Sequence, residues 1–535
     1  MEVKYLSAKD LLYIISVSLA LGVWLAFIHD GNRLIGFISF SFLFLLSFTL
    51  LKISRPWRNS RTLGFIVALA FFLRLAVGLT LHLALPIYGH EDEEDKAGYV
   101  FTDAYRRDRQ AWELASSERP LVVAFTDKFA YDQYGGLLAF AAFIYRYLSP
   151  DAHRPLMLVL LSAFVGTLSV PFLWRATERI FNEKVAFASA WIFALYPEAI
   201  LLGSSAMREP YLLMFSAFAL WGFINWSQRA VISAQRELSE PTSGHSRKAG
   251  IWLGVGLLGM LLVSPAVALV TLLVFVGWMF FTNERRSLSW KIVLIFAVVL
   301  MLGLFFLSAS LNRSGEFDST SPLHVVNDWL RLAVKWNAYQ IERESGWVQK
   351  LFDEMPEWMR LPFVAVYGIF QPVLPAALVA PTKLIWKTIY LLRSLGWYAL
   401  LPLLVLSFVA AAGQPSSRVR NLVLWLSLLT WTWILLAALR GGGDLWDNPR
   451  YRTILFLWQA LIAGYVWVWW RETHNLWFVQ VLACEVAFIA VFTQWYASRY
   501  FHWGGQLPFG GMILLIVGLW VIILGAGWWQ ARRRA

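Results

Sequence analysis

The chain has 535 residues, of which 59% are hydrophobic and only 15% are charged, and its formal net charge is +12. Soluble domains carry about 25% charged residues, so this composition excludes an ordinary soluble protein. Many apolar runs are long enough to cross a hydrocarbon core of roughly 30 Å as a helix, and the sequence has no alternating strands of the membrane-barrel type. We therefore predict an all-α, polytopic helical membrane protein. Basic cytoplasmic loops explain the positive charge in such a chain, so we expect no nucleic acid partner.

The apolar runs predict about 14 transmembrane helices, or about 13 if one of them is re-entrant. The first run lacks a small-residue cleavage site and a second span follows at once, which favours a retained helix over a signal peptide. The single cysteine, Cys484, excludes a disulfide framework and a cysteine metal site. The predicted spans are 10–28, 34–52, 63–86, 154–174, 185–204, 209–226, 250–264, 265–282, 291–309, 388–411, 421–439, 452–470, 475–495 and 509–529.

Basic short loops predict how the chain is oriented in the membrane. Residues 52–61 and the chain end at 532–534 are basic, and so are the loops 283–291 and 413–420. Placing all four in the cytoplasm requires an even number of spans and puts both termini on that side.

The same orientation leaves two large segments on the outer face, residues 87–153 and 310–387. Between 87 and 132 the first segment has eleven acidic against six basic side chains. The apolar pieces 135–148 and 361–375 are short for a span, so we interpret them as juxtamembrane helices, interfacial or re-entrant. The predicted organisation is an N-terminal transmembrane hairpin (1–62), a front transmembrane module with the first outer loop (63–226), a cytoplasmic linker (227–249) and a C-terminal transmembrane module with the second outer loop (250–535).

The stretch "DAYRRDRQAWELA" (103–115) carries the first candidate site residues, Asp103 and Asp108. Its apolar residues recur at spacings that suit a short helix, with Asp103 near the N-terminus. Asp103 could be a helix cap and Asp108 a solvated acid. Alternatively, Asp103 projects into an outer cavity, where it deprotonates a hydroxyl or holds a divalent cation. We interpret the preceding acidic run, 91–95, as a solvated, flexible patch.

A second candidate is "AMREPYLL", with Arg208 and Glu209 before Pro210. Glu209 followed by proline fits a simple helix start. However, the predicted topology puts Glu209 and Asp103 on the same side of the membrane, next to neighbouring spans. Two carboxylates that converge there could share a metal or divide acid and base roles.

Four further charged residues lie at or within predicted spans. Arg450 and Arg452 in "DLWDNPRYR" could hold a phosphate through the planar guanidinium, or could anchor the chain at the interface with their aromatic neighbours. Arg74 and Glu485 lie inside spans, where a charge costs about 2.5–3.5 kcal/mol and normally faces the bundle interior with a partner. Each could be functional or half of a structural ion pair. Nucleotide-binding loops and HExxH spacing are absent from the sequence, which argues against a nucleotide-driven machine.

The order of these features along the chain resembles the membrane glycosyltransferases of the GT-C fold. That family includes the protein O-mannosyltransferases and the aminoarabinose transferases of lipid A, which depend on polyprenyl-phosphate sugars. The matching segments are "FFLRLAVG", "DAYRRDRQA" (103–111), the stretch 131–213 and "NPRYR" (448–452). Two departures are Arg107, where many relatives have tyrosine, and Glu209, where the second acid is usually aspartate.

The resemblance implies a GT-C-like fold with its catalytic module at 63–226, and an inverting hexosyl- or pentosyltransferase at the outer face of the cytoplasmic (inner) membrane. Asp103 matches the first-loop acid that acts on the acceptor, and Glu209 matches the second outer acid. Together they would hold a divalent cation, Mg²⁺ or Mn²⁺, if one is used. The residues expected to contact substrate are Asp108, Arg208, Arg450, Arg452 and Arg74.

The sequence leaves the partners and three other functions open. The expected donor is a polyprenyl-phosphate-linked sugar, and the acceptor is a lipid, a glycan or a protein; membrane lipids surround the chain. The alternatives are a polysaccharide polymerase or ligase with a lipid-pyrophosphate donor, a membrane transporter, and a scaffold subunit without catalytic activity. A transporter would place several ionisable side chains along a mid-membrane path, whereas most acids here lie in the outer segments.

Overall fold

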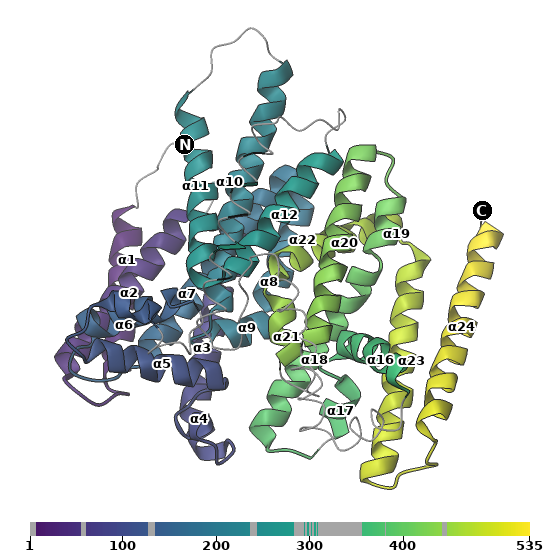
Figure 1. Ribbon diagram of the computed structural model, residues 1–535, viewed down its shortest axis with the longest axis horizontal. Helices are drawn as coiled ribbons and strands as arrows, with labels where there is room; N and C mark the ends of the chain where they lie inside the picture. Colours follow the sequence, from purple (N-terminus) through teal and green to yellow (C-terminus); the bar gives the residue numbers. More distant parts are fainter. Residues whose placement is uncertain are drawn as a thin grey trace.

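A computed structural model describes residues 7–54, 60–126, 134–235, 243–282, 356–379, 381–440 and 447–534, with isolated positions between 294 and 308. Across these residues the secondary structure is helical and contains no strand. Long helices stand side by side, and a group of short helices lies at one end of the bundle (Figure 1). The predicted all-α, multi-pass class is therefore confirmed.

Nine helices in the described ranges are long and apolar enough to cross a membrane, or ten if the bent pair α8–α9 is one span. The nine are α1 (Ala8–Ala26), α2 (Arg33–Ser54), α3 (Ser60–Tyr88), α7 (Leu156–Ile180), α12 (Pro265–Thr282), α18 (Leu384–Val405) continued by α19 (Ser407–Ala412), α20 (Ser417–Arg440), α23 (Leu476–Tyr500) and α24 (Phe509–Arg534). Three other predicted spans are also helical, as α10 (Glu209–Gln235), α11 (Ser243–Val263) and α22 (Phe456–Thr473). The span predicted at 291–309 lies largely outside the described residues, so the count of about 14 stays a prediction.

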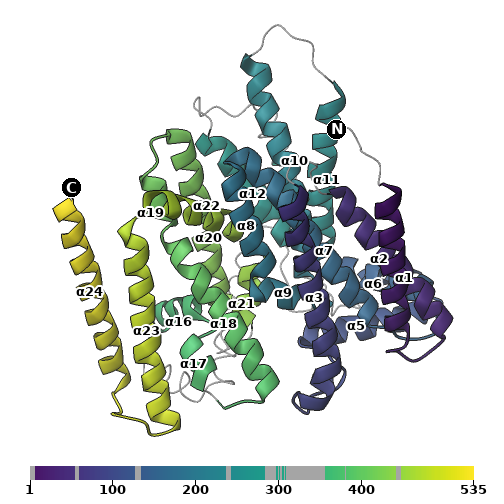
Figure 2. The same ribbon diagram turned by 180° about the vertical axis from the view of Figure 1, so that it is seen from behind.

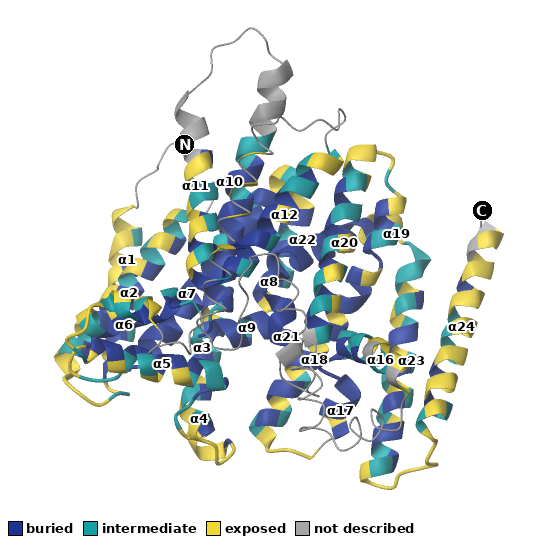
Figure 3. Cartoon of the chain, in the orientation of Figure 1, coloured by how far each residue is buried: buried dark blue, intermediate teal, exposed yellow. Residues whose placement is uncertain are grey.

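Helix α7 lies at the centre of the front half of the chain. Its whole apolar window is buried, and it packs against α2, α3, α8 and α10. By contrast, α24 at the edge exposes most of its apolar side chains, as Figure 3 shows. An exposed apolar helix at the edge of a bundle is what a lipid environment permits, since lipid is as apolar as the side chains themselves.

A break in one span is stabilised by the buried Arg74. Helix α8 (Glu183–Leu195) and helix α9 (Pro197–Gly203) meet at an angle of 58°. Pro197 has no N–H, so it cannot donate to the Phe193 carbonyl as a continuing helix would. Arg74 supplies that donor instead: its guanidinium lies 3.3 Å from the Phe193 carbonyl and 3.4 Å from that of Ala194. The sequence predicted a partner for Arg74 inside the bundle. In the described structure its guanidinium bonds main-chain carbonyl oxygens at the break.

The first outer segment forms four short elements at the end of the bundle that carries α4 and α5 (Figure 1). Helix α6 is only 13 residues long, too short to span the membrane, as predicted. Its Arg146 donates to the carbonyls of Leu114, Ser117 and Arg119, and so caps the end of α5. The elements are α4 (Glu93–Lys96), α5 (Thr102–Ala115), the 3₁₀ turn η1 (Leu121–Phe125) and α6 (Gly136–Leu148).

The acidic run 91–95 is not solvated throughout, and for Asp95 the prediction is wrong. Asp95 is buried and accepts a 2.9 Å hydrogen bond from Trp386 Nε1 on α18. Burial raises the pKa of its carboxyl, and the hydrogen bonds from Trp386 and the His90 N–H oppose that rise. This contact fixes α4 against a distant helix, whereas Glu91 and Asp92 are exposed as predicted.

Part of the second outer segment is also described. The predicted short piece 361–375 falls on α16 (Glu357–Phe370) and α17 (Leu374–Val379). The carbonyls at the end of α16 are capped by Trp397 Nε1 at 2.7 Å and Tyr398 Oη at 3.1 Å. A location at the membrane interface stays a prediction, and residues 310–355 lie outside the described part of the chain.

The ends of the bundle agree with the predicted topology. Helix α1 begins and α24 ends at the same end of the molecule, opposite α4 and α5 (Figures 1 and 2). The first outer segment therefore lies at the end of the bundle opposite the start of α1 and the end of α24. That this side is the outer face of the membrane remains a prediction from the basic loops.

A buried ion pair joins the front and back halves of the chain. Arg393 on α18 donates to Glu198 on α9 at 2.5 Å and 3.0 Å, and each side chain is 1% exposed. Two charges at this depth are stable only together, because removal of either leaves the other buried without compensation.

We predict that Glu198→Leu or Arg393→Leu alone destabilises the protein by about 3–5 kcal/mol, while the double variant recovers much of the loss. Thermal unfolding of the purified protein measures both effects. The matched control is Lys184→Ala, which breaks the exposed pair with Glu472 and should leave the melting temperature unchanged. A double variant as unstable as the sum of the two single variants would contradict the prediction.

Candidate functional site

Asp103 lies in the first turn of α5, where the helix dipole favours a negative charge. Its Oδ2 is 2.7 Å from Nη1 of Arg450, which comes from α21 (Asp447–Thr453) far along the chain. Burial would raise the pKa of Asp103, but the charges of Arg450, Arg107 and Arg208 outweigh it and lower the pKa to about 2. Asp103 is therefore a carboxylate at every physiological pH.

Arg450 also reaches the second predicted acid. Its Nε lies 3.4 Å from Oε1 of Glu209, at the first residue of α10, and Arg208 Nε lies 3.8 Å from the same oxygen. The Glu209 side chain is 0% exposed, and within the described structure neither of its oxygens has a hydrogen-bond partner. Such a carboxylate depends on the neighbouring guanidinium charges. The predicted convergence of Asp103 and Glu209 is present in the structure, with Arg450 between the two acids and Arg208 beside Glu209.

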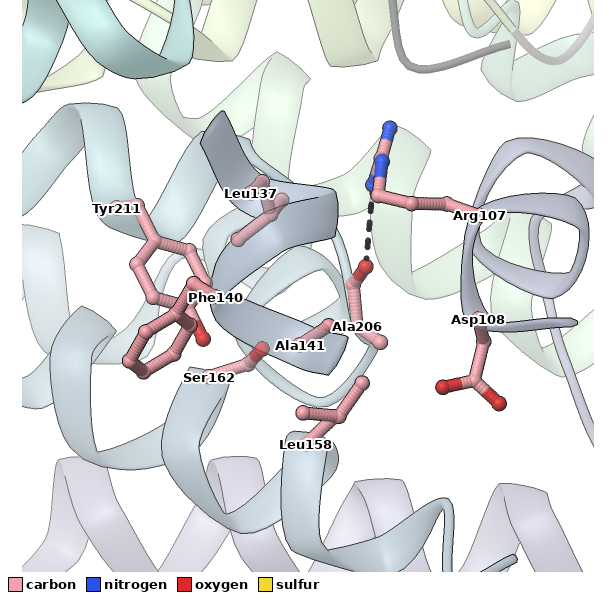
Figure 4. Close-up of a pocket in the computed structure, with 9 residues that line it drawn as sticks. All are labelled: Arg107, Asp108, Leu137, Phe140, Ala141, Leu158, Ser162, Ala206 and Tyr211. Atoms are coloured by element: carbon pink, nitrogen blue, oxygen red, sulfur yellow. Dashed lines mark hydrogen bonds between the residues drawn. The ribbon is translucent and has the colours of Figure 1, made fainter. Parts of the chain in front are cut away.

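A third arginine, Arg107, is one helical turn from Asp103 and was not among the predicted site residues. Its guanidinium turns away from Asp108 and donates to the Ala206 carbonyl at 3.2 Å (Figure 4). Ala206 belongs to the turn that leads into α10, so this bond ties the helix of Asp103 to the helix of Glu209. The spacing of four residues between Asp103 and Arg107 was the signal available in the sequence.

Asp108 lies apart from the arginine cluster and is an anchor for α5. It is buried and accepts hydrogen bonds from the hydroxyls of Tyr99 and Tyr145, while His153 Nε2 lies 2.6 Å from its Oδ2. Burial and the charge of Asp108 raise the pKa of both tyrosines well above the usual range, so both hydroxyls remain donors. The three partners come from the turn before α5, from α6 and from the turn after α6.

Arg107 and Asp108 also line a small cavity of about 10 Å³, together with α6, α7 and α10 side chains such as Ser162 and Tyr211 (Figure 4). A volume of this order holds one water molecule. It is too small for a sugar or a lipid phosphate.

The remaining predicted arginines are engaged elsewhere. Arg452, two residues after Arg450, donates to the Gln371 carbonyl at 2.9 Å and stacks over the ring of Trp397. Arg74 caps the α8–α9 break, as described above. Glu485 lies on α23, and its Oε1 has no hydrogen-bond partner within the described ranges. The hydrogen bonds described for Arg74 and Arg452 thus end on main-chain carbonyls and not on Asp103 or Glu209.

The carboxylates do not fit a divalent cation in the observed arrangement. Mg²⁺ and Mn²⁺ require several oxygen ligands around a common point. Here the guanidinium of Arg450 lies between Asp103 and Glu209. Within the residues that the structure describes, no group of three or more histidine, cysteine, aspartate or glutamate side chains could hold a metal.

Comparisons with known proteins find similarity at the level of structure. No protein-family model matches the chain, and no curated protein matches it. The archaeal oligosaccharyltransferase AglB from Archaeoglobus fulgidus, in complex with an inhibitory peptide and a dolichol-phosphate, is similar with a TM-score of 0.42 and 12% identity, over 88% of this chain and 56% of that chain. The apo form of the oligosaccharyltransferase from the same organism gives a TM-score of 0.43 and 12% identity, over 87% and 56% of the two chains. Its complex with Zn and sulfate gives 0.40 and 14%, over 84% and 53%.

The chain thus spans about half the length of the solved structures that it matches. At this identity and TM-score, the similarity assigns neither an activity nor a substrate to this chain.

We predict that Asp108→Leu loosens α5, because it leaves the hydroxyls of Tyr99 and Tyr145 buried without their acceptor. Each such group costs about 1–3 kcal/mol, so the melting temperature should fall and protease cleavage around α5 should speed up. The matched control is Glu118→Leu, which changes an exposed acid in the same outer segment. Equal effects of the two substitutions would contradict an anchoring role for Asp108.

Proposed function

We propose that the chain is an inverting glycosyltransferase that moves a sugar from a polyprenyl-phosphate donor to an acceptor at the outer face of a cytoplasmic membrane. One observation carries the proposal: Arg450 joins Asp103 and Glu209, two acids from distant parts of the sequence, at one end of a helical bundle. The site lies with α5 at the end of the bundle opposite the start of α1 and the end of α24, which agrees with the predicted outer face.

The charge of the cluster suits a phosphate donor. Three guanidinium groups, from Arg107, Arg208 and Arg450, surround the two carboxylates, which leaves one formal positive charge. A polyprenyl-phosphate sugar carries one negative charge on its phosphodiester. Its leaving group gains a second negative charge as the glycosidic bond breaks, so the guanidinium groups would stabilise the transition state more than the bound donor.

The resting arrangement makes Asp103 a poor base, since a pKa of about 2 leaves little affinity for a proton. A donor phosphate that binds Arg450 would draw the guanidinium away from Asp103. The carboxylate would then lose its strongest favourable charge interaction and gain proton affinity. Donor binding and base activation would be coupled through one arginine side chain.

The transfer step then follows from this geometry. The acceptor hydroxyl donates to Asp103, and its oxygen attacks the anomeric carbon from the face opposite the phosphate. The new carbon–oxygen bond forms as the bond to the phosphate oxygen breaks, and the electron pair leaves on the lipid phosphate. Asp103 takes the proton of the hydroxyl, and attack from the opposite face inverts the anomeric configuration.

Glu209 has a different part in this proposal. Its side chain is fully buried and lies beside Arg208 and Arg450. We assign it as a positioning residue that holds both guanidinium groups toward the donor phosphate.

We predict that Asp103→Asn lowers sugar transfer by about 10²-fold or more, because the amide cannot accept the proton. The assay follows a radiolabelled sugar from a polyprenyl-phosphate donor in proteoliposomes that contain the purified protein. The control Asp10→Asn removes a carboxylate of the same kind from a half-buried ion pair with Lys52, far from α5 in the sequence, and should leave transfer unchanged. Normal transfer by Asp103→Asn would remove Asp103 from the mechanism.

We further predict that EDTA changes the transfer rate by less than about twofold, because a guanidinium and not a metal joins the two carboxylates. Arg450→Lys keeps the charge but loses the planar fork, and should slow transfer with or without added Mg²⁺ or Mn²⁺. Loss of activity in EDTA, with recovery on addition of either cation, would contradict this prediction.

A further inference from the structure

The outer surface of α5 forms one side of an open groove of about 710 Å³ that the arginine cluster does not use. Every side chain that lines it is polar or aromatic. The lining includes Arg106, Arg109, Trp112, Glu113, Ser116 and His153.

This lining suits a carbohydrate better than a peptide. A sugar ring has an apolar face of C–H groups and an edge of hydroxyls that both donate and accept. The ring of Trp112 can stack on the apolar face of the sugar. The planar ends of Arg106, Arg109 and Glu113 can hydrogen-bond to its hydroxyls. A docked peptide normally uses a strand edge or apolar side-chain pockets, and this groove is lined by no aliphatic side chain.

The aromatic wall of the groove is held in place by the anchor of α5. Trp112 stacks on the ring of His153, with centroids 5.3 Å apart and planes 28° apart. Tyr145 meets the same indole edge-on at 5.7 Å. Both partners also contact Asp108, so the orientation of Trp112 is fixed before any ligand binds, and little conformational freedom is lost on binding.

The first residue of α5 that lines the groove, Arg106, follows the candidate catalytic carboxylate closely along the helix. Arg106 and Asp103 are three residues apart on one helix and are therefore neighbours on its surface. From Arg106 to Ser116 the groove follows α5 for about 15 Å, at 1.5 Å per residue. A ligand that lies along this length can bring one end to Asp103.

We propose that this groove binds the sugar residues of a carbohydrate acceptor and directs its reacting hydroxyl toward Asp103. The role as an acceptor site rests on the proposed glycosyl transfer, whereas the binding of carbohydrate does not. Trp112 contacts the face of a sugar ring, and Arg106 and Glu113 contact its hydroxyls.

The test is direct binding of the purified, full-length protein to an array of immobilised hexose, N-acetylhexosamine and uronic acid oligosaccharides, with serine-, threonine- and asparagine-containing peptides on the same surface. The wild-type protein should bind at least one glycan and no peptide. Trp112→Ala should lose at least tenfold in glycan binding, and Trp112→Phe should recover most of it. Arg106→Ala and Glu113→Gln should each weaken binding severalfold.

Two variants separate this inference from the proposed function. Trp503→Ala removes a tryptophan that is 69% exposed outside the groove, and should bind glycans as the wild type does. Asp103→Asn should keep glycan binding while it loses transfer. Glycan binding without transfer in the wild type would overturn the proposed function alone.

Three outcomes would overturn the carbohydrate site itself: no binding to any glycan, binding to peptides only, and glycan binding that none of the groove variants changes. Melting temperatures of all variants, measured beside the wild type, show that the loss comes from the groove and not from unfolding.

Discussion

The contact on which the site depends is the bridge of Arg450 to Asp103 and Glu209. A guanidinium presents five donors in a rigid plane, so two of its edges can face two carboxylates at once, whereas an ammonium group is a single point charge. Glu209 is fully buried and has no hydrogen bond within the described residues, so its charge is compensated by Arg450 and Arg208. Arg450 on α21 therefore links three separate elements through its ion pairs: α21 itself, α5 of the outer segment and the start of α10.

Other arginine side chains donate hydrogen bonds to backbone carbonyls where helices end or break. Arg74 donates to carbonyls at the α8–α9 break, Arg146 to carbonyls after α5, and Arg107 to the turn before α10. At the α8–α9 break, inside a candidate span, a backbone carbonyl has no water to bond with, so it needs a donor from the protein itself. Arg146 and Arg107 in this way position the backbone that carries Asp103 and Glu209.

The sequence predicted the class, most of the helices and the meeting of Asp103 with Glu209, because apolar length and membrane side are local properties of the chain. It could not distinguish Arg450 from Arg452, since the two are separated by one residue and reach different partners only in the packed structure. For Asp108 the sequence offered a solvated acid or a substrate contact and not an anchor, because its partners Tyr145 and His153 lie 37 and 45 residues away. Asp95 was misassigned for the same reason, since Trp386 is 291 residues distant.

Helix α5 contributes to the arginine cluster, to the buried anchor and to the groove, because successive residues of a helix point to different faces. Asp103 and Arg107 share the face toward the arginine cluster, Asp108 and Ala111 share the buried face, and Arg106 and Glu113 face the groove. Its end is capped and its middle is held by three side chains, so a large movement of α5 would break all of these contacts together. The side chain of Arg450 is the simpler element to move, since a donor phosphate can replace Asp103 as the partner of its Nη1. A reaction at this site would therefore begin with a rearrangement of one side chain on a fixed scaffold.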